Sequence, residues 1–215
     1  MFDIILKYFW LLMIYSFIGW LIEVISMFFN TGKITDRGFL IGPYCPIYGC
    51  AGVLMTLFLS RYQNNILLLF IMAIIICGTL EYFTSYLMEK IFKARWWDYS
   101  EKKYNLNGRI CLDTLIPFGI LGVIVIMFVN PLLFRFLNWI PNVVRVVLGI
   151  IIFVIFMIDI VFSITVIFSL RGTIKKVALD NTEEITDLVK KVIRERSIIH
   201  RRLVKAFPNL KIKLR

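Results

Sequence analysis

Hydrophobic residues fall into five long runs along the chain, separated by short polar connections. The runs cover residues 5–29, 40–60, 65–89, 110–130 and 143–170. A helix needs about 20 mainly apolar residues to cross the roughly 30 Å hydrocarbon layer of a bilayer. The pattern therefore predicts an all-α polytopic membrane protein with about five transmembrane helices, contained in a transmembrane domain of residues 1–170.

The second run begins with a stretch rich in glycine and proline, RGFLIGPYCPIYG at residues 37–49. Pro43 and Pro46 lack a backbone donor and have a fixed φ, so a regular helix is not expected before about Pro46. Small residues share one face of any helical part and allow close backbone approach; they are Gly38, Gly42, Cys45, Gly49 and Gly52. The stretch is either a tightly packed helix with a kinked start or irregular, partly re-entrant backbone that lines a polar cavity.

The distribution of Lys and Arg predicts the orientation in the membrane. All of these residues except Lys7, Arg61, Arg135 and Arg145 lie in the connections near residues 30–40 and 90–110 or in the tail after residue 170. Basic residues are concentrated on the cytoplasmic side of membrane proteins. We therefore expect the N-terminus outside and the C-terminus inside. The first run contains Glu23 and is too long for a signal-peptide core, so it should remain as a membrane anchor.

Residues 171–215 differ from the rest in composition, because basic residues outnumber acidic ones and long apolar runs are absent. Apolar residues recur at near-heptad spacing and predict an amphipathic basic helix in the cytoplasm. Its basic face could bind anionic lipid headgroups, or its apolar stripe could pair with another helix. We expect no nucleic-acid partner.

Ionisable residues within the runs converge on the predicted inner leaflet. An unpaired charge in mid-membrane costs about 3 to 10 kcal/mol, so such groups usually face one another or water. The candidates for a substrate- or ion-binding site are Glu23, Arg37, Glu81, Arg109 and Asp113. The alternative, which we favour less, is a set of structural ion pairs, for example Glu23 with Arg109 and Glu81 with Arg37. Asp159 alone lies near the middle of its run.

Composition narrows the possible chemistry. Hydrophobic residues make up 60% of the chain, and no second, soluble catalytic domain fits. The four cysteines lie in or beside apolar runs with no histidine near them, so we expect reduced packing residues, no metal site and no cofactor. No serine, histidine or cysteine arrangement favours nucleophilic catalysis, and we expect that the protein is not an enzyme.

Four separated motifs occur in order along roughly the first 125 residues: GWLIE at 19–23, RGFLIGPYCPIYG at 37–49, EYFTSYLMEKIFKARWWDYS at 81–100 and NLNGRICL at 105–112. Together they resemble the bacterial family called putative ABC-transporter type IV (CmpB-like). The resemblance implies a multi-pass permease component of a transporter in the bacterial cytoplasmic membrane. Within these motifs we assign structural roles to Gly38, Gly42, Pro43, Cys45, Pro46, Gly49, Trp97 and Asp98.

Three functions follow from these observations. The first is a permease-like subunit with a polar site in the inner-leaflet half of the bundle. The chain has no phosphate-loop motif, so ATP hydrolysis would require a separate ATP-binding subunit. Five spans are few for a complete transport pathway, which favours a homo-oligomer or heteromer.

The second possible function is an enzyme or binding protein for a lipid or isoprenoid phosphate held by Arg37 and Arg109. The third is a membrane scaffold or sensor that acts through its tail.

Overall fold

The computed structural model describes residues 2–35, 38–92, 94–178 and 211–212. Its helices are α1 (Phe2–Thr31), α2 (Pro46–Leu59), α3 (Ile66–Phe92), α4 (Leu112–Ile124), α5 (Asn130–Trp139) and α6 (Asn142–Ala178). A 3-10 turn, η1 (Ser60–Tyr62), follows α2, and a π-helical segment, η2 (Val125–Val129), joins α4 to α5. Two short antiparallel pairs complete the fold: β1 (Ala94–Arg95) with β4 (Lys211–Ile212), and β2 (Asn105–Leu106) with β3 (Ile110–Cys111).

Four helices in the described part of the chain are long and apolar enough to cross a membrane. They are Phe2–Thr31, Ile66–Phe92, Leu112–Trp139 and Asn142–Val166, so the predicted all-α membrane fold is confirmed. In the run at 40–60 no helix begins before Pro46, as expected, but the helix that follows is shorter than a membrane span. The run forms non-helical backbone up to Cys45 and then the 14-residue α2, which at 1.5 Å per residue is about 21 Å long. That is short of the roughly 30 Å needed, and five crossings remain a prediction.

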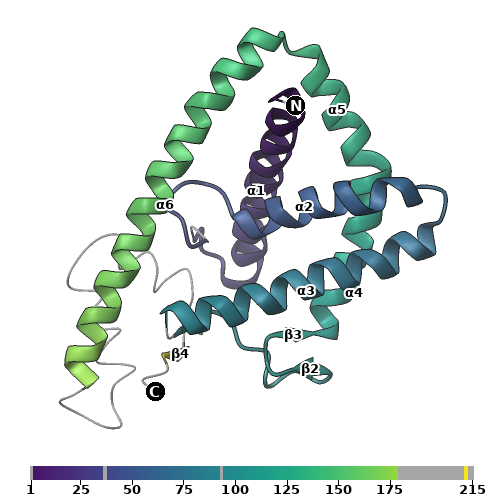
Figure 1. The fold of residues 1–215 in the computed structure, drawn as a ribbon. Coiled ribbons are helices and arrows are strands. Elements are labelled where there is room, and N and C mark those ends of the chain that lie inside the picture. The colour runs from purple at the N-terminus through teal and green to yellow at the C-terminus, as the bar shows by residue number, and fades with distance from the viewer. Residues whose placement is uncertain (1, 36–37, 93, 179–210, 213–215) are drawn as a thin grey trace.

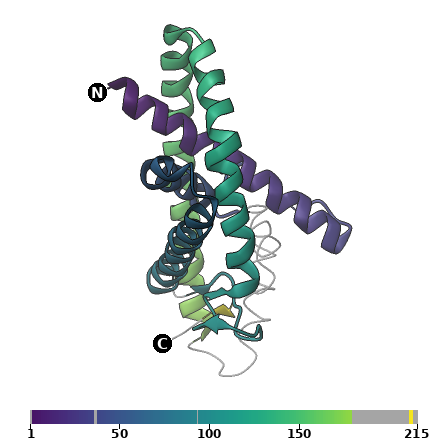
Figure 2. The same cartoon turned by 90° about the vertical axis from the view of Figure 1, so that its right-hand side faces the viewer.

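The α5–α6 connection and the β2–β3 hairpin lie at opposite ends of the molecule, whereas the α2–α3 connection lies at its side (Figure 1). Figure 1 shows the N-terminal end of α1 and the α5–α6 connection toward the top, with the β2–β3 hairpin and the end of α6 at the bottom. Figure 2 shows the α5–α6 connection and the β2–β3 hairpin at opposite ends from the side. Which end faces the cytosol remains a prediction.

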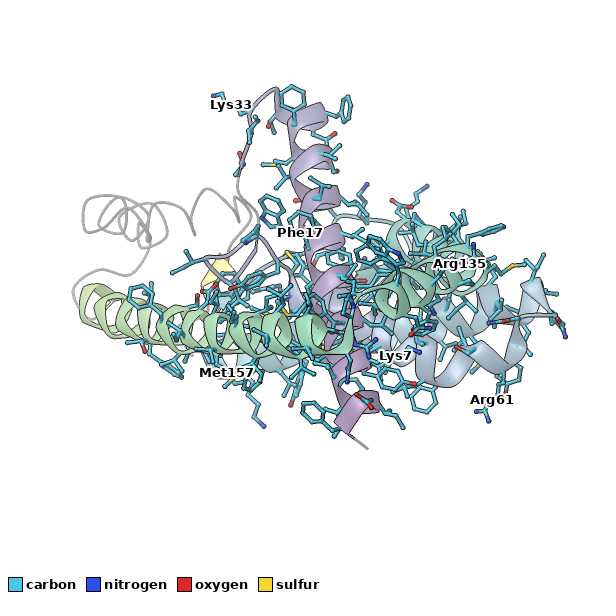
Figure 3. All side chains as sticks on the ribbon, turned by 90° about the horizontal axis from the view of Figure 1, so that it is seen from above. Lys7, Phe17, Lys33, Arg61, Arg135 and Met157 are labelled. Atoms are coloured by element: carbon cyan, nitrogen blue, oxygen red, sulfur yellow. The ribbon has the colours of Figure 1, made fainter. Side chains whose placement is uncertain are left out.

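The helices cross at large angles and leave much apolar surface facing outward. Seen from above, α1 runs across α6, with Lys33 beyond its far end, while Arg61 lies at the outer end of the α2–α3 hairpin (Figure 3). Phe17 is 46% exposed and Met157 is 42% exposed. In a membrane-spanning chain such side chains contact lipid, and for this reason their exposure is not a sign of poor packing.

Glycines allow α1 and α2 to pack closely. A Cβ at Gly49 would overlap the Ser16 hydroxyl and the Leu12 carbonyl oxygen, and one at Gly52 would overlap the Tyr15 ring. The Cys45 amide also donates a hydrogen bond of 2.9 Å to the Ser16 carbonyl. The small-residue face predicted from the sequence is therefore the face that contacts α1.

Replacing Gly49 by valine is expected to destabilise the protein by about 1–3 kcal/mol or more, since α1 lies where the new side chain must go. Unfolding titrations in mixed detergent and SDS micelles would measure the change. Leu57→Phe is the matched control, because Leu57 is 50% exposed on the same helix and can take a larger side chain. A Gly49→Val variant as stable as this control would contradict the packing.

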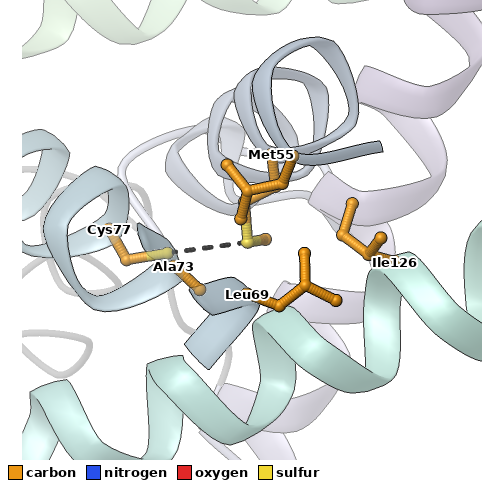
Figure 4. Close-up of a cluster of buried hydrophobic side chains, with 6 residues drawn as sticks. Met55, Leu69, Ala73, Cys77 and Ile126 are labelled. Carbon is orange, nitrogen blue, oxygen red and sulfur yellow. Dashed lines mark hydrogen bonds between the residues drawn. The ribbon is translucent and has the colours of Figure 1, made fainter. Parts of the chain in front are cut away.

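The apolar cluster with the most buried residues in the described part of the chain lies between α2, α3 and η2. It contains Met55, Leu59, Leu69, Ala73, Cys77 and Ile126 (Figure 4). The Cys77 sulfur lies 4.0 Å from the Met55 sulfur, so this cysteine packs like an apolar residue. All four cysteines are free thiols.

Two expectations concern the C-terminal part. The last apolar run was expected to end near residue 170, whereas α6 continues as one helix to Ala178. The predicted amphipathic basic helix of the tail falls almost entirely on residues 179–210, which lie outside the described residues. That helix and the division into two domains at residue 170 remain predictions.

Candidate functional site

An ion-pair network, formed by Glu89, Arg95, Asp98 and Arg109, lies where α3 meets the hairpin. Arg109 is only 8% exposed; its guanidinium pairs with Glu89 at 2.8 Å and donates to the Ser85 hydroxyl at 3.2 Å. Arg95 contacts Glu89 at 3.2 Å and Asp98 at 3.3 Å. Two carboxylates thus balance two guanidinium groups. This balance matters because an unpaired buried charge is costly.

The motif NLNGRICL forms the turn that positions Arg109. Asn107 and Gly108 both have positive φ, which a type I′ turn requires and which Asn-Gly favours. The Arg109 amide closes the turn by donating to the Leu106 carbonyl at 3.0 Å. The Trp97 indole donates to the Arg109 carbonyl at 3.1 Å. The turn therefore directs the Arg109 side chain toward α3, where its guanidinium lies over the Tyr82 and Tyr86 rings.

The second polar group is the carboxylate–hydroxyl cluster of Glu23, Tyr48, Glu81, Tyr99 and Thr114. Glu81 is 7% exposed and accepts hydrogen bonds from Tyr99 at 3.2 Å and Thr114 at 3.4 Å. Glu23 accepts a hydrogen bond from the Tyr48 hydroxyl. Burial raises the pKa of the Tyr99 hydroxyl, and the negative charges of Glu81 and, to a smaller degree, Glu23 act in the same direction. Both carboxylates therefore act on one buried tyrosine.

The structure does not bring the five candidate residues from the sequence together in one site. Glu23 and Glu81 belong to the carboxylate–hydroxyl cluster, while Arg109 belongs to the ion-pair network and pairs with Glu89 instead of Glu23. Asp113 lies outside both: its side chain is 65% exposed and pairs with Lys102 at 3.3 Å on the surface. Arg37 lies outside the described residues.

Asp159 holds the irregular stretch before α2 against α6. Its carboxylate accepts hydrogen bonds from the backbone amides of Ile41 at 3.0 Å and Gly42 at 2.7 Å. It also accepts from the hydroxyls of Tyr44 at 2.6 Å and Ser163 at 2.8 Å. The buried carboxylate thus accepts from four donors, and two of these are backbone amides that have no helix to bond within. The structural role assigned to the Gly-Pro-rich stretch thus has a physical basis in α6.

Further residues of that stretch fix its exit into α2. Gly38 has a φ of +121°, which favours glycine. Cys45 is the N-cap position of α2 and Pro46 occupies its first turn, where the missing amide costs nothing. Gly42 lies so close to the Tyr44 ring that a Cβ would overlap it. The stretch can therefore turn sharply between its contact with Asp159 of α6 and its contact with Ser16 of α1, where α2 begins.

A fourth polar group consists of hydrogen bonds between Tyr15, Asn130 and Thr56. Tyr15 donates to the Asn130 side-chain carbonyl at 2.6 Å, and the Asn130 amide donates to the Thr56 hydroxyl at 3.0 Å. Asn130 is 2% exposed and directly follows the π-helical segment. These bonds connect α1, α2 and α5, because polar side chains in an apolar bundle must find partners.

The sequence-based site omitted Asp159, Asn130, Glu89 and Arg95. Asp159 carried the clearest signal, as an acid in the middle of an apolar run. Glu89 lies at the end of an apolar run, where an acid can be solvated at the membrane interface, and only the hairpin brings Arg109 to it. Among the described residues, no group of three or more His, Cys, Asp or Glu side chains is placed to hold a metal ion.

The fold and the buried polar groups define a multi-pass α-helical membrane protein. Residues 10–164 match the model of the family described as Putative ABC-transporter type IV, and the chain belongs to this family. The family description names an ABC transporter, and the four long apolar helices are consistent with a membrane component of one. Comparisons with curated proteins and with solved structures gave no significant match.

Proposed function

We propose that the chain is a permease-like subunit of a transporter in the bacterial cytoplasmic membrane. It works with a separate ATP-binding subunit and assembles as a homo-oligomer or heteromer. In this proposal the carboxylate–hydroxyl cluster binds the transported molecule or a coupling ion. Family membership supports the transporter class, and the burial of Glu81 supports the location of the site.

Glu81 is the observation that carries this proposal. None of the ion pairs between described residues includes it, and the hydrogen bonds that reach it come from the hydroxyls of Tyr99 and Thr114. An ionisable residue inside a membrane helix is costly and usually functional. Hydroxyl donors can be exchanged for a ligand more readily than a buried guanidinium can.

The alternative of a phosphate site on Arg109 receives less support. The guanidinium already contacts Glu89 and Ser85 and lies over two tyrosine rings. A phosphate would have to displace the buried carboxylate of Glu89. We therefore assign Arg109 a structural role and leave Asp113 out of the proposed site.

Co-expression with candidate ATP-binding subunits tests the proposal. One of these subunits should co-purify with the chain in detergent and hydrolyse ATP after reconstitution. Glu81→Gln should leave the complex assembled but reduce transport-coupled hydrolysis about tenfold or more, since bonds to a charged group contribute about 1.5–3 kcal/mol.

Asp113→Asn is the matched control, because it neutralises an exposed acid near the same end of the molecule. It should leave both assembly and hydrolysis unchanged. Failure of every candidate subunit to co-purify would contradict the transporter assignment. Equal hydrolysis by the Glu81→Gln and Asp113→Asn complexes would contradict the site while leaving the assignment intact.

A further inference from the structure

The two long faces of α3 differ in character. Glu81, Ser85 and Glu89 recur every four residues and point toward the polar groups described above. Ile76, Thr79, Phe83, Tyr86 and Lys90 recur every three or four residues and share a different face. Of these, Phe83 is 57% exposed, Tyr86 is 43% exposed, and Lys90 is exposed. The second face therefore looks outward, into the surroundings of the helix bundle.

An apolar groove lies on this outward face. Its volume is about 290 Å³, and it is lined by Leu54 and Phe58 from α2 together with Ile76, Thr79 and Phe83 from α3. Figures 1 and 2 show α2 and α3, the two helices that line it, side by side. In a membrane protein a lipid-facing apolar groove of this kind is filled by hydrocarbon, since neither water nor a polar side chain can replace it.

Lys90 continues the line of the groove along α3. It lies seven positions after Phe83, which is about 10 Å along a helix, and it is in the last turn, where α3 leaves its apolar run. Its ammonium lies 5.9 Å from the centre of the Tyr86 ring, and none of the ion pairs between described residues includes it. A cation at this position complements an anion at the level of the headgroups.

We propose that this face binds one anionic phospholipid of the surrounding membrane. One acyl chain occupies the groove between α2 and α3, and the phosphate lies against Lys90. Tyr86 lies between them, at the boundary where tyrosine is favoured in membranes. A second copy of the chain would fill the apolar groove but would also need an acidic group opposite Lys90. A phospholipid provides both parts in one molecule.

Native mass spectrometry of the full chain, released from detergent containing equal amounts of phosphatidylglycerol and phosphatidylcholine, tests this proposal. The wild-type protein should retain one phosphatidylglycerol in preference to phosphatidylcholine. Lys90→Gln should reduce that preference about fivefold, which corresponds to about 1 kcal/mol for one basic residue near the headgroups. Arg61→Gln, at the opposite end of α3, is the matched control and should not change it.

A second variant separates the acyl chain from the headgroup. Thr79→Trp fills the groove from an exposed position and should reduce the retention of both lipids, while unfolding titrations remain as in the wild type. Equal retention of the two lipids by the wild-type protein would overturn the proposal. So would an equal effect of Lys90→Gln and Arg61→Gln, or a wild-type dimer that Thr79→Trp converts to a monomer, because a second copy would then be the occupant.

Discussion

Replacing Asp159 by alanine is expected to lower the free energy of unfolding by about 3–5 kcal/mol. The change leaves four donors without their acceptor, namely the amides of Ile41 and Gly42 and the hydroxyls of Tyr44 and Ser163. Each buried polar group left unsatisfied costs about 1–3 kcal/mol, and partial relaxation reduces the sum. Unfolding titrations in mixed detergent and SDS micelles would measure the loss.

Two further variants make this result specific. Asp159→Asn keeps the shape and one acceptor oxygen, so its stability should lie between those of the wild type and the alanine variant. Asp113→Ala removes an acid whose side chain is 65% exposed and should change stability by no more than about 0.5 kcal/mol. If Asp159→Ala were as stable as Asp113→Ala, α6 would not hold the stretch before α2 in place.

Replacing Arg109 by alanine is expected to lower the free energy of unfolding by about 3–5 kcal/mol, because Glu89 then loses one of its two arginine partners. Arg95 still contacts Glu89 at 3.2 Å, which should keep the loss toward the lower end of that range. The same unfolding titration measures it. Lys102→Ala is the control: that lysine is 59% exposed in its pair with Asp113 and should contribute less than about 1 kcal/mol.

A double-mutant cycle distinguishes the loss of the ion pair from simple loss of packing. Once Glu89→Gln has removed the buried negative charge, Arg109→Ala should cost less than it does alone. We expect a coupling of about 1.5 kcal/mol or more, within the range measured for contacting residues. Strictly additive losses would show that Arg109 stabilises the protein through the Tyr82 and Tyr86 rings and not through Glu89.

The sequence predicted the local features reliably where one physical signal dominated. Long apolar runs identified the membrane helices, because about 20 apolar residues have few alternatives in a bilayer. Pro46 marked the start of α2, since proline favours the first turn and disrupts the interior of a helix. The spacing of Gly49 and Gly52 correctly predicted a face for close helix contact.

The pairing of charged groups could not be predicted in the same way. Depth along the membrane suggested that Glu23 could meet Arg109, but depth says nothing about the direction in which a side chain points around its helix. The β2–β3 turn determines that direction for Arg109 and brings it to Glu89. Asp113 is near in sequence to the polar groups, yet it projects to the surface and pairs with Lys102.

By itself, the sequence determined that the chain is a helical membrane protein, where most of its helices lie and which residues carry charge into the apolar runs. Hydrophobicity and backbone restrictions act over short stretches, so they can be read from neighbouring residues. Only the tertiary structure decided that Asp159 binds the stretch before α2, that Arg109 joins Glu89 and that Glu81 meets Tyr99. These contacts join residues that are distant in the chain or separated by an irregular loop, and their geometry depends on how the helices pack.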